Sequence, residues 1–290
     1  MLLTILLSVA VIIFVAGNAA RIVKLLRMPI PLRWELYPIP KGPRERQRYG
    51  GSYFEDSDWW TKPQSIGHQG ELAFMAREVL FLKSVRDGFR GLWLWSWLLH
   101  WGLYLYAAAT VVVVAGFLAG SGSLRTVAAC GYWLACLLGL LGSIGVLILR
   151  AWHPRLRAFT TRTSIFNLLL LGSIFASGIA SSIAGATLLD ARAGNLRPWT
   201  ALYGHLVLVA FFLAYFPFTH MTHAYMKFFT WHGVRWDDSP ALNDPHIAGK
   251  LAANLQRKVT WAAPHIASGE SATWSEVVSD PSGQGVAKRA

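Results

Sequence analysis

The sequence has little charge and almost no cysteine. Charged residues make up 14% of the 290 residues, whereas 54% are hydrophobic and the mean hydropathy is +0.38. This composition excludes an ordinary soluble domain. The two cysteines, Cys130 and Cys136, lie in one apolar run, and the sequence contains no C-x-x-C-H motif. Covalent haem attachment and cysteine-built iron–sulfur or zinc sites are therefore excluded, and both cysteines are interpreted as small packing residues.

In place of charged residues and cysteines, the sequence contains long apolar runs. Five of them could span a bilayer: residues about 2–20, 91–118, 126–149, 164–189 and 199–226. The first run has no basic residue before it, and Arg21, Lys24 and Arg27 follow it. This order favours a retained anchor with its N-terminus outside over a cleaved signal peptide.

The basic residues predict the orientation of the other spans. With the N-terminus outside, every Lys and Arg falls in an inner segment except Arg125, Arg192 and Arg197. Such a bias is typical of a multi-pass protein with its C-terminus in the cytoplasm. The net charge of +12 is therefore interpreted as membrane topology and contact with anionic lipid, not as nucleic-acid binding.

The predicted fold is an all-α integral membrane protein with five transmembrane helices. Residues 1–20 form the first span, and residues 91–228 form a four-helix core. Residues 21–90 form a cytoplasmic insert, in which a proline-rich extended loop (28–63) precedes an amphipathic helix over 71–90. That helix suits the membrane surface or a partner equally. The polar tail, 229–290, is predicted to dock on a partner because it is too small to bury its own core.

Two histidines lie in the last apolar segment, which the pattern predicts to be one helix over residues 199–229. His205 and His223 are separated by 18 residues, which is five helical turns, so both would project from one face about 27 Å apart. Imidazole at membrane depth is costly without a partner. Haem b, whose iron takes a histidine from each of two facing helices, is the usual partner.

His100 is the histidine whose depth in the second span matches that of His223. Both would lie nearer the cytoplasmic surface, so we expect them to be the axial ligands of one haem b, with His220 as a possible alternative ligand. The competing interpretation is that they are buried histidines with ordinary hydrogen bonds.

The outer half of the bundle contains no second pair. Ten residues after His100, where a partner for His205 would lie, the sequence has Thr110. We therefore expect one haem, although two are possible. His205 would either accept a proton from a quinol or hydrogen-bond to a neighbour.

Three stretches of the core resemble a known family. HLVLVAFFLAYFPFTHMTHAY, from His205, is similar to the last helix of the gamma subunit of respiratory nitrate reductase. LLHWGLYLYAAAT and LILRAWHPRLRAFTT resemble the second helix and the end of the third helix of that subunit. The resemblance covers most of residues 91–228.

The resemblance implies two stacked haems b, the cytoplasmic one held by the residues matching His100 and His223. The outer haem would need His205 and the position of Thr110, where this sequence departs from the pattern. The family's quinol site lies beside the outer haem and uses a basic residue near the start of the third helix. Arg125 is the candidate here, which makes His205, Thr110 and Arg125 a possible quinone site.

The flanks resemble another branch of the same family. PLRWELYPIP and VTWAAPHIASGESATWSEVV are similar to the membrane cytochrome b of complexes associated with dissimilatory sulfite reductase, and to the cytochrome of membrane heterodisulfide reductase. That branch implies electron transfer between menaquinone and a cytoplasmic iron–sulfur subunit similar to the catalytic subunit of heterodisulfide reductase. Further membrane subunits and a periplasmic cytochrome c are possible partners.

The sequence therefore predicts the haem b subunit of a quinone-linked oxidoreductase in the cytoplasmic (inner) membrane of a prokaryote, with no stand-alone catalysis. Arg150, Arg155 and Arg157, at the inner end of the third span, are candidates for contacts with haem propionates or a partner. The alternatives are a structural membrane anchor without haem and a histidine-based proton channel or transporter. The absence of Asp, Glu and Lys from the middle of the spans disfavours the channel and the transporter.

Overall fold

The structure is a computed structural model that describes residues 2–27, 57, 58, 61, 68–183, 196–229, 245–259 and 273–279. Over these ranges the chain is mainly helical, and its only strand pairing is an isolated bridge between Lys258 and Thr273. Five helical segments within them are long and apolar enough to cross a membrane, as predicted. They are α1 (Leu2–Leu26), α5 (Arg90–Leu118), α6 (Gly122–Trp152), α8 (Arg162–Ile183) and Ala201–Phe218, most of which belongs to α9 (Leu196–Tyr215). Two predicted segments lie outside the described residues. They are the extended loop over 28–63, apart from residues 57, 58 and 61, and the last residues of the fourth span, 184–189.

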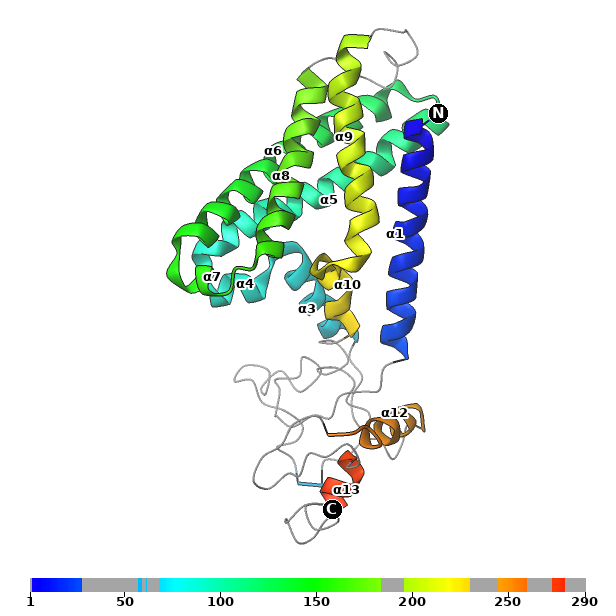
Figure 1. Ribbon diagram of the computed structural model, residues 1–290, viewed down its shortest axis with the longest axis vertical. Coiled ribbons are helices and arrows are strands. Elements are labelled where there is room, and N and C mark those ends of the chain that lie inside the picture. The colour runs from blue at the N-terminus through cyan, green and yellow to red at the C-terminus, as the bar shows by residue number, and fades with distance from the viewer. Residues whose placement is uncertain are drawn as a thin grey trace. The chain divides into compact units, whose positions relative to one another are not determined.

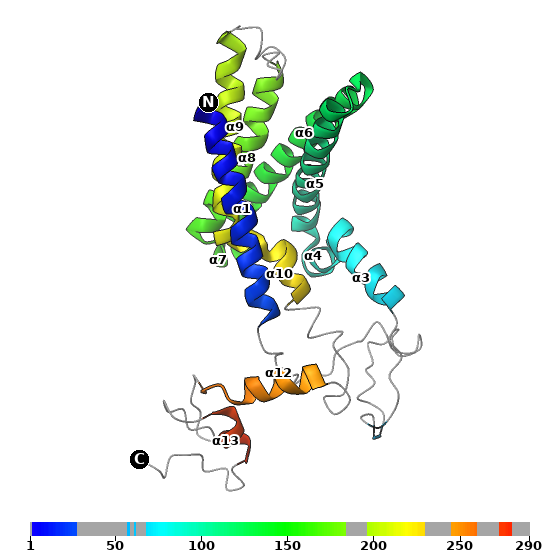
Figure 2. The same cartoon turned by 90° about the vertical axis from the view of Figure 1, so that its right-hand side faces the viewer.

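The chain divides into two compact units, each of which is described by itself. The first contains Met1–Asn18 and Ala73–Thr219, and the second contains Ala19–Leu72 and His220–Ala290. In the first unit the long helices pack in chain order: α5 against α6, α6 against α8, and α8 against α9 (Figures 1 and 2). The short connection from α5 to α6 uses Gly120, whose φ of +63° favours glycine, and Ser121, whose side chain accepts a hydrogen bond from Leu124 N.

Glycines allow α5 and α6 to approach closely. A Cβ added to Gly102 would lie 2.5 Å from Gly139 Cα, and one added to Gly142 would overlap the backbone of Leu99. Without a hydrophobic force between helices in lipid, such close backbone packing is a main source of their association. Of the two cysteines on α6, Cys136 is buried as expected, whereas Cys130 is exposed, so the packing interpretation is wrong for Cys130.

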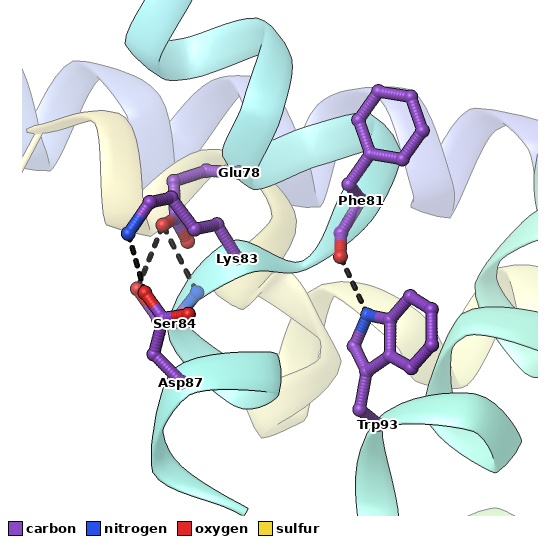
Figure 3. Close-up of polar contacts among 6 residues, drawn as sticks. All are labelled: Glu78, Phe81, Lys83, Ser84, Asp87 and Trp93. Atoms are coloured by element: carbon purple, nitrogen blue, oxygen red, sulfur yellow. Dashed lines mark hydrogen bonds and ion pairs between the residues drawn. The ribbon is translucent and has the colours of Figure 1, made fainter. Parts of the chain in front are cut away.

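The helix predicted over 71–90 is in fact two helices, α3 (His68–Phe81) and α4 (Lys83–Gly88). They are separated by Leu82, whose φ of 47° lies in the left-handed region. Figure 3 shows how the break is held. The buried carboxylate of Glu78 accepts hydrogen bonds from the backbone nitrogen and the hydroxyl of Ser84, at 3.1 and 2.8 Å. The amphipathic pattern correctly predicted helix, but it could not show that Glu78 would cap a new one.

The single helix predicted over 199–229 is also wrong. α9 ends at Tyr215, and the chain continues as two 3-10 turns, η4 (Phe216–Phe218) and η5 (His220–Thr222), before α10 (His223–Lys227). Pro217 has no backbone N–H to donate, and its ring would clash with the carbonyl four residues earlier in a regular helix. The helix therefore does not continue through it. Thr219 is extended, with φ −113° and ψ 170°. Five uninterrupted turns therefore do not separate His205 from His223.

The N-terminal helix contacts this break within each unit. In the first unit, Phe14 packs on Phe216 with ring centroids 5.5 Å apart, and a Cβ on Gly17 would lie 2.7 Å from Pro217 Cβ. In the second unit, Arg21 Nη1 donates to Thr222 Oγ1 at 2.6 Å. The second unit also contains α12 (Pro245–Leu255) and the short helix α13 (Trp274–Ser279).

Candidate functional site

His205 lies at the centre of a hydrogen-bonded cluster that joins four helices. The side chain, on α9, is 3% exposed. Its Nε2 lies 2.8 Å from the hydroxyl of Tyr106 on α5 and 2.9 Å from that of Tyr132 on α6. Its Nδ1 lies 3.0 Å from the hydroxyl of Ser177 on α8. Each helix of the core thus contributes one side chain to what we call the His205 cluster: Tyr106, Tyr132, Ser177 and His205.

The direction of the bonds in the cluster can be inferred from Ser177. Its hydroxyl donates its only proton to the carbonyl of Ile174 at 3.0 Å, so it accepts a bond from His205 Nδ1–H. Nε2 then has the lone pair and accepts from a tyrosine hydroxyl. Both imidazole nitrogens are used within the bundle. This geometry matches the expectation that His205 hydrogen-bonds to neighbours.

The two tyrosines are site residues that sequence reasoning missed. Tyr106 lies one turn before Thr110, and Tyr132 lies on α6 opposite Gly178 of α8. A Cβ on Gly178 would lie 2.6 Å from the Tyr132 hydroxyl, so the glycine makes room for it. The available signal was a phenol in the middle of an apolar span, because a hydroxyl buried there needs a partner.

Thr110 and Arg125, which the sequence grouped with His205, have other contacts. The Thr110 side chain is exposed, and its hydroxyl donates to the carbonyl of Tyr106 at 2.9 Å. Arg125 Nε donates to the carbonyl of Ser121 at 3.3 Å, and its guanidinium lies 5.6 Å from the centroid of the Phe117 ring. Arg125 therefore packs on the α5–α6 connection. The link between Thr110 and the cluster runs only through the backbone of Tyr106.

His100 is half-buried on α5, in the first unit. Its Nδ1 lies 2.6 Å from the carbonyl of Ser96, one turn earlier, to which a ring N–H can donate. Such a bond places the proton on Nδ1 and the lone pair on Nε2. Metal-binding histidines have this arrangement, since the second nitrogen fixes both the tautomer and the ring orientation.

His223 makes the same kind of bond in the second unit. It is the first residue of α10, is exposed, and has Nδ1 3.1 Å from the carbonyl of His220. His220, the possible alternative ligand, lies on η5 and is also exposed. The preceding residue, Thr222, is fully buried, and its hydroxyl accepts from Arg21 and donates to Met226 Sδ at 3.2 Å. These bonds hold the turn that bears His223.

The arginines at the end of α6 differ from one another. Arg150, in the last turn of α6, is half-buried, and its Nε is buried with no hydrogen-bond partner in the part of the chain described. Arg155 and Arg157 lie exposed on α7 (Pro154–Ala158). A buried N–H without an acceptor is unfavourable, so Arg150 is the one suited to an additional anionic group.

The described histidines do not gather as ligands of a bare metal ion. No three His, Cys, Asp or Glu side chains gather into a metal-binding group in the described ranges. A structural zinc ion needs four protein ligands and a catalytic one three, whereas haem iron needs one or two. His100 and His223, each with Nδ1 on a backbone carbonyl, have the tautomer that an axial ligand requires.

Comparisons of the chain with family models, with curated proteins and with solved structures found no match.

Proposed function

We propose that this chain is the haem b subunit of a quinone-linked oxidoreductase and that His100 and His223 are the axial ligands. The carrying observation is the bond that each makes from Nδ1 to a backbone carbonyl, at 2.6 and 3.1 Å. Both ring nitrogens of His205 are hydrogen-bonded to side chains of the bundle, so His205 is assigned a structural role. His100 and His223 belong to different units, and their pairing rests on the sequence.

The residues have separate tasks in this proposal. Ser96 and His220 orient the two imidazoles through their backbone carbonyls, and Arg21 holds the turn before His223 through Thr222. The guanidinium of Arg150 would neutralise a propionate of the bound haem, which would satisfy its buried Nε. When bound, haem b would supply one-electron transfer at membrane depth.

The cellular role follows from the sequence. The protein spans the cytoplasmic membrane of a prokaryote with its N-terminus outside and its C-terminus in the cytoplasm. It carries electrons between menaquinol and a cytoplasmic iron–sulfur subunit that resembles the catalytic subunit of heterodisulfide reductase. Residues 21–90 and 229–290 dock that subunit. The charge bias and the two sequence resemblances support these assignments.

Haem counting on the purified protein tests this proposal. A pyridine haemochrome assay should give about one haem b per chain in the unsubstituted protein. His100→Ala and His223→Ala should each lose most of it, because one axial bond is removed in each variant. His220→Ala is the matched control, since it removes an imidazole three residues away but keeps the carbonyl that orients His223.

Other outcomes would change the assignment. If His220→Ala loses haem and His223→Ala keeps it, His220 is the ligand. If the unsubstituted protein contains two haems per chain, an unforeseen pair of ligands exists. If it contains none when purified with its natural partners, the cytochrome proposal is wrong and the structural anchor replaces it.

A further inference from the structure

The last carbonyls of α3 have an unusual set of hydrogen-bond partners. A helix leaves its last four carbonyls without intrahelical donors. That of Glu78 accepts from Leu82 N at 3.1 Å. The other three, those of Val79, Leu80 and Phe81, accept from aromatic side chains of α5. The donors are Tyr104 Oη (3.1 Å, to Val79), Trp101 Nε1 (3.0 Å, to Leu80), Trp97 Nε1 (2.9 Å, to Leu80) and Trp93 Nε1 (2.7 Å, to Phe81).

These four donors form a row along one helix. Their spacing, at 93, 97, 101 and 104, places them on one face of α5. We call Trp93, Trp97, Trp101 and Tyr104 the aromatic row. Figure 3 shows the first of them, with the indole of Trp93 directed at the carbonyl of Phe81. The end of α3 is thus fastened to α5 through its backbone, independently of its side chains.

If this helix end were in water, its carbonyls would not need side-chain donors. Carbonyls at an exposed helix end normally bond to solvent at no cost. In hydrocarbon there is no water to replace a missing donor, and each unsatisfied backbone group is strongly unfavourable. Side-chain donors to every remaining carbonyl are what a helix end surrounded by acyl chains requires.

Among the described residues, none shields this helix end from water. The side chains of Val79, Leu80 and Phe81 are 45%, 38% and 51% exposed. Leu72, further back on α3, is 69% exposed. The surface around the satisfied carbonyls is therefore apolar and uncovered by protein in the described chain. Whatever covers it lies outside the described residues.

The charges beside this surface indicate what covers it. Lys83 and Asp87 form an ion pair with each other, and the carboxylate of Glu78 is buried on Ser84. The nearby charges that make no ion pair in the described chain are Arg77 on α3, Arg86, whose guanidinium lies 5.3 Å from the centroid of the Trp93 ring, and Arg90. Exposed arginines next to tryptophans and apolar side chains are typical of the membrane interface, where arginine meets anionic headgroups.

We infer that the end of α3 is inserted into one leaflet of the bilayer and that α4 lies at the level of its headgroups. The end of α3 lies among acyl chains, with its carbonyls satisfied by the aromatic row, and Arg86 and Arg90 bind the phosphates of anionic lipid. This inference goes beyond the proposed function and does not depend on haem.

Spin labels test the depth of the two helices. The full chain, with Cys130→Ala to remove the exposed thiol, is reconstituted in nanodiscs of phosphatidylethanolamine and phosphatidylglycerol. A nitroxide at Phe81→Cys should collide with oxygen and be protected from a water-soluble nickel chelate. The control label at Gly88→Cys, where added atoms meet nothing within 4 Å, should show the opposite preference. A Phe81 label that collides freely with the nickel chelate would overturn the inference.

A second variant tests the aromatic row. Trp97→Phe with Trp101→Phe keeps both rings but removes both donors to Leu80. The exposure of the Phe81 label to the nickel chelate should rise roughly tenfold or more, since a buried carbonyl loses its partners. Trp133→Phe, at a tryptophan 42% exposed on α6, is the control and should change nothing. Equal exposure in all three proteins would show that the row does not hold α3 in place.

Two further measurements need no label. Hydrogen exchange on the unsubstituted chain in the same nanodiscs should show slow exchange over residues 79–85, and fast exchange there would contradict the inference. Native mass spectrometry should show retained phosphatidylglycerol that Arg86→Gln with Arg90→Gln loses, whereas equal retention would remove the headgroup part. If assembly with partner subunits shields the Phe81 label from oxygen as well, a protein covers this surface and the lipid assignment is wrong.

Discussion

The histidines of this protein differ in how their two ring nitrogens are used. Both ring nitrogens of His205 are hydrogen-bonded to side chains from three other helices. His100 and His223 each give Nδ1 to a backbone carbonyl of their own segment. The first pattern joins helices to one another, whereas the second ties the imidazole to its own segment, an arrangement that is common among metal-binding histidines. Residue identity alone does not distinguish these uses, because all three histidines belong to apolar spans or their ends.

Removing His205 should therefore destabilise the bundle without removing haem. His205→Ala leaves three hydroxyls without their shared partner, and an interhelical hydrogen bond in a membrane protein contributes about 0.6 kcal/mol on average. Because the neutral imidazole makes two hydrogen bonds, the free energy of unfolding should fall by about 1 kcal/mol, measured by denaturant titration in mixed micelles. Haem content per chain should stay the same. Loss of half the haem would instead make His205 an iron ligand and contradict the structural role.

At the scale of elements, backbone contact decides how the helices pack. Gly139 and Gly142 on α6 face Gly102 and Leu99 on α5 so closely that no side chain fits between them. The break after Tyr215 is an equally local effect, since Pro217 stops α9. The proline was visible in the sequence, and the continuous apolar pattern around it led to the wrong prediction of one helix.

The contact between α5 and α6 should be sensitive to a single methyl group. In Gly142→Ala the added Cβ would overlap the backbone of Leu99, which cannot rotate away as a side chain could. Overpacking of this kind costs about 1–3 kcal/mol, so the unfolding free energy should fall by that amount. Gly204→Ala, on α9 with nothing within 4 Å, is the matched control and should be neutral or stabilising. Equal effects of the two substitutions would exclude close helix packing as the cause.

At the scale of the whole molecule, the distribution of charge is the main evidence for orientation. All but three of the 27 Lys and Arg residues fall on one side when the five spans alternate. Among the described residues, five helical segments are long and apolar enough to span a membrane, which is the predicted number. The orientation of these spans in the membrane is still a prediction from the distribution of charge.

Reporter fusions would test that direction. Green fluorescent protein fused after Ala290 should fluoresce, and alkaline phosphatase at the same position should be inactive, because the C-terminus is predicted to lie in the cytoplasm. The same pair fused after Gly120, between α5 and α6, should give the reverse result. Active phosphatase at the C-terminus would invert the topology and place the proposed haem on the opposite side of the membrane.

The sequence by itself determined that the chain is helical and membrane-spanning, because apolar length and the scarcity of charge are local properties that survive any arrangement of neighbours. It also predicted the four boundaries of α5 and α6 to within a few residues. Only the tertiary structure decided the partners of His205, since Tyr106, Tyr132 and Ser177 lie 28 to 99 residues away in the chain. The break at Leu82 and the aromatic row are likewise tertiary, because a helix pattern cannot show that carbonyls at the end of α3 will find donors on α5.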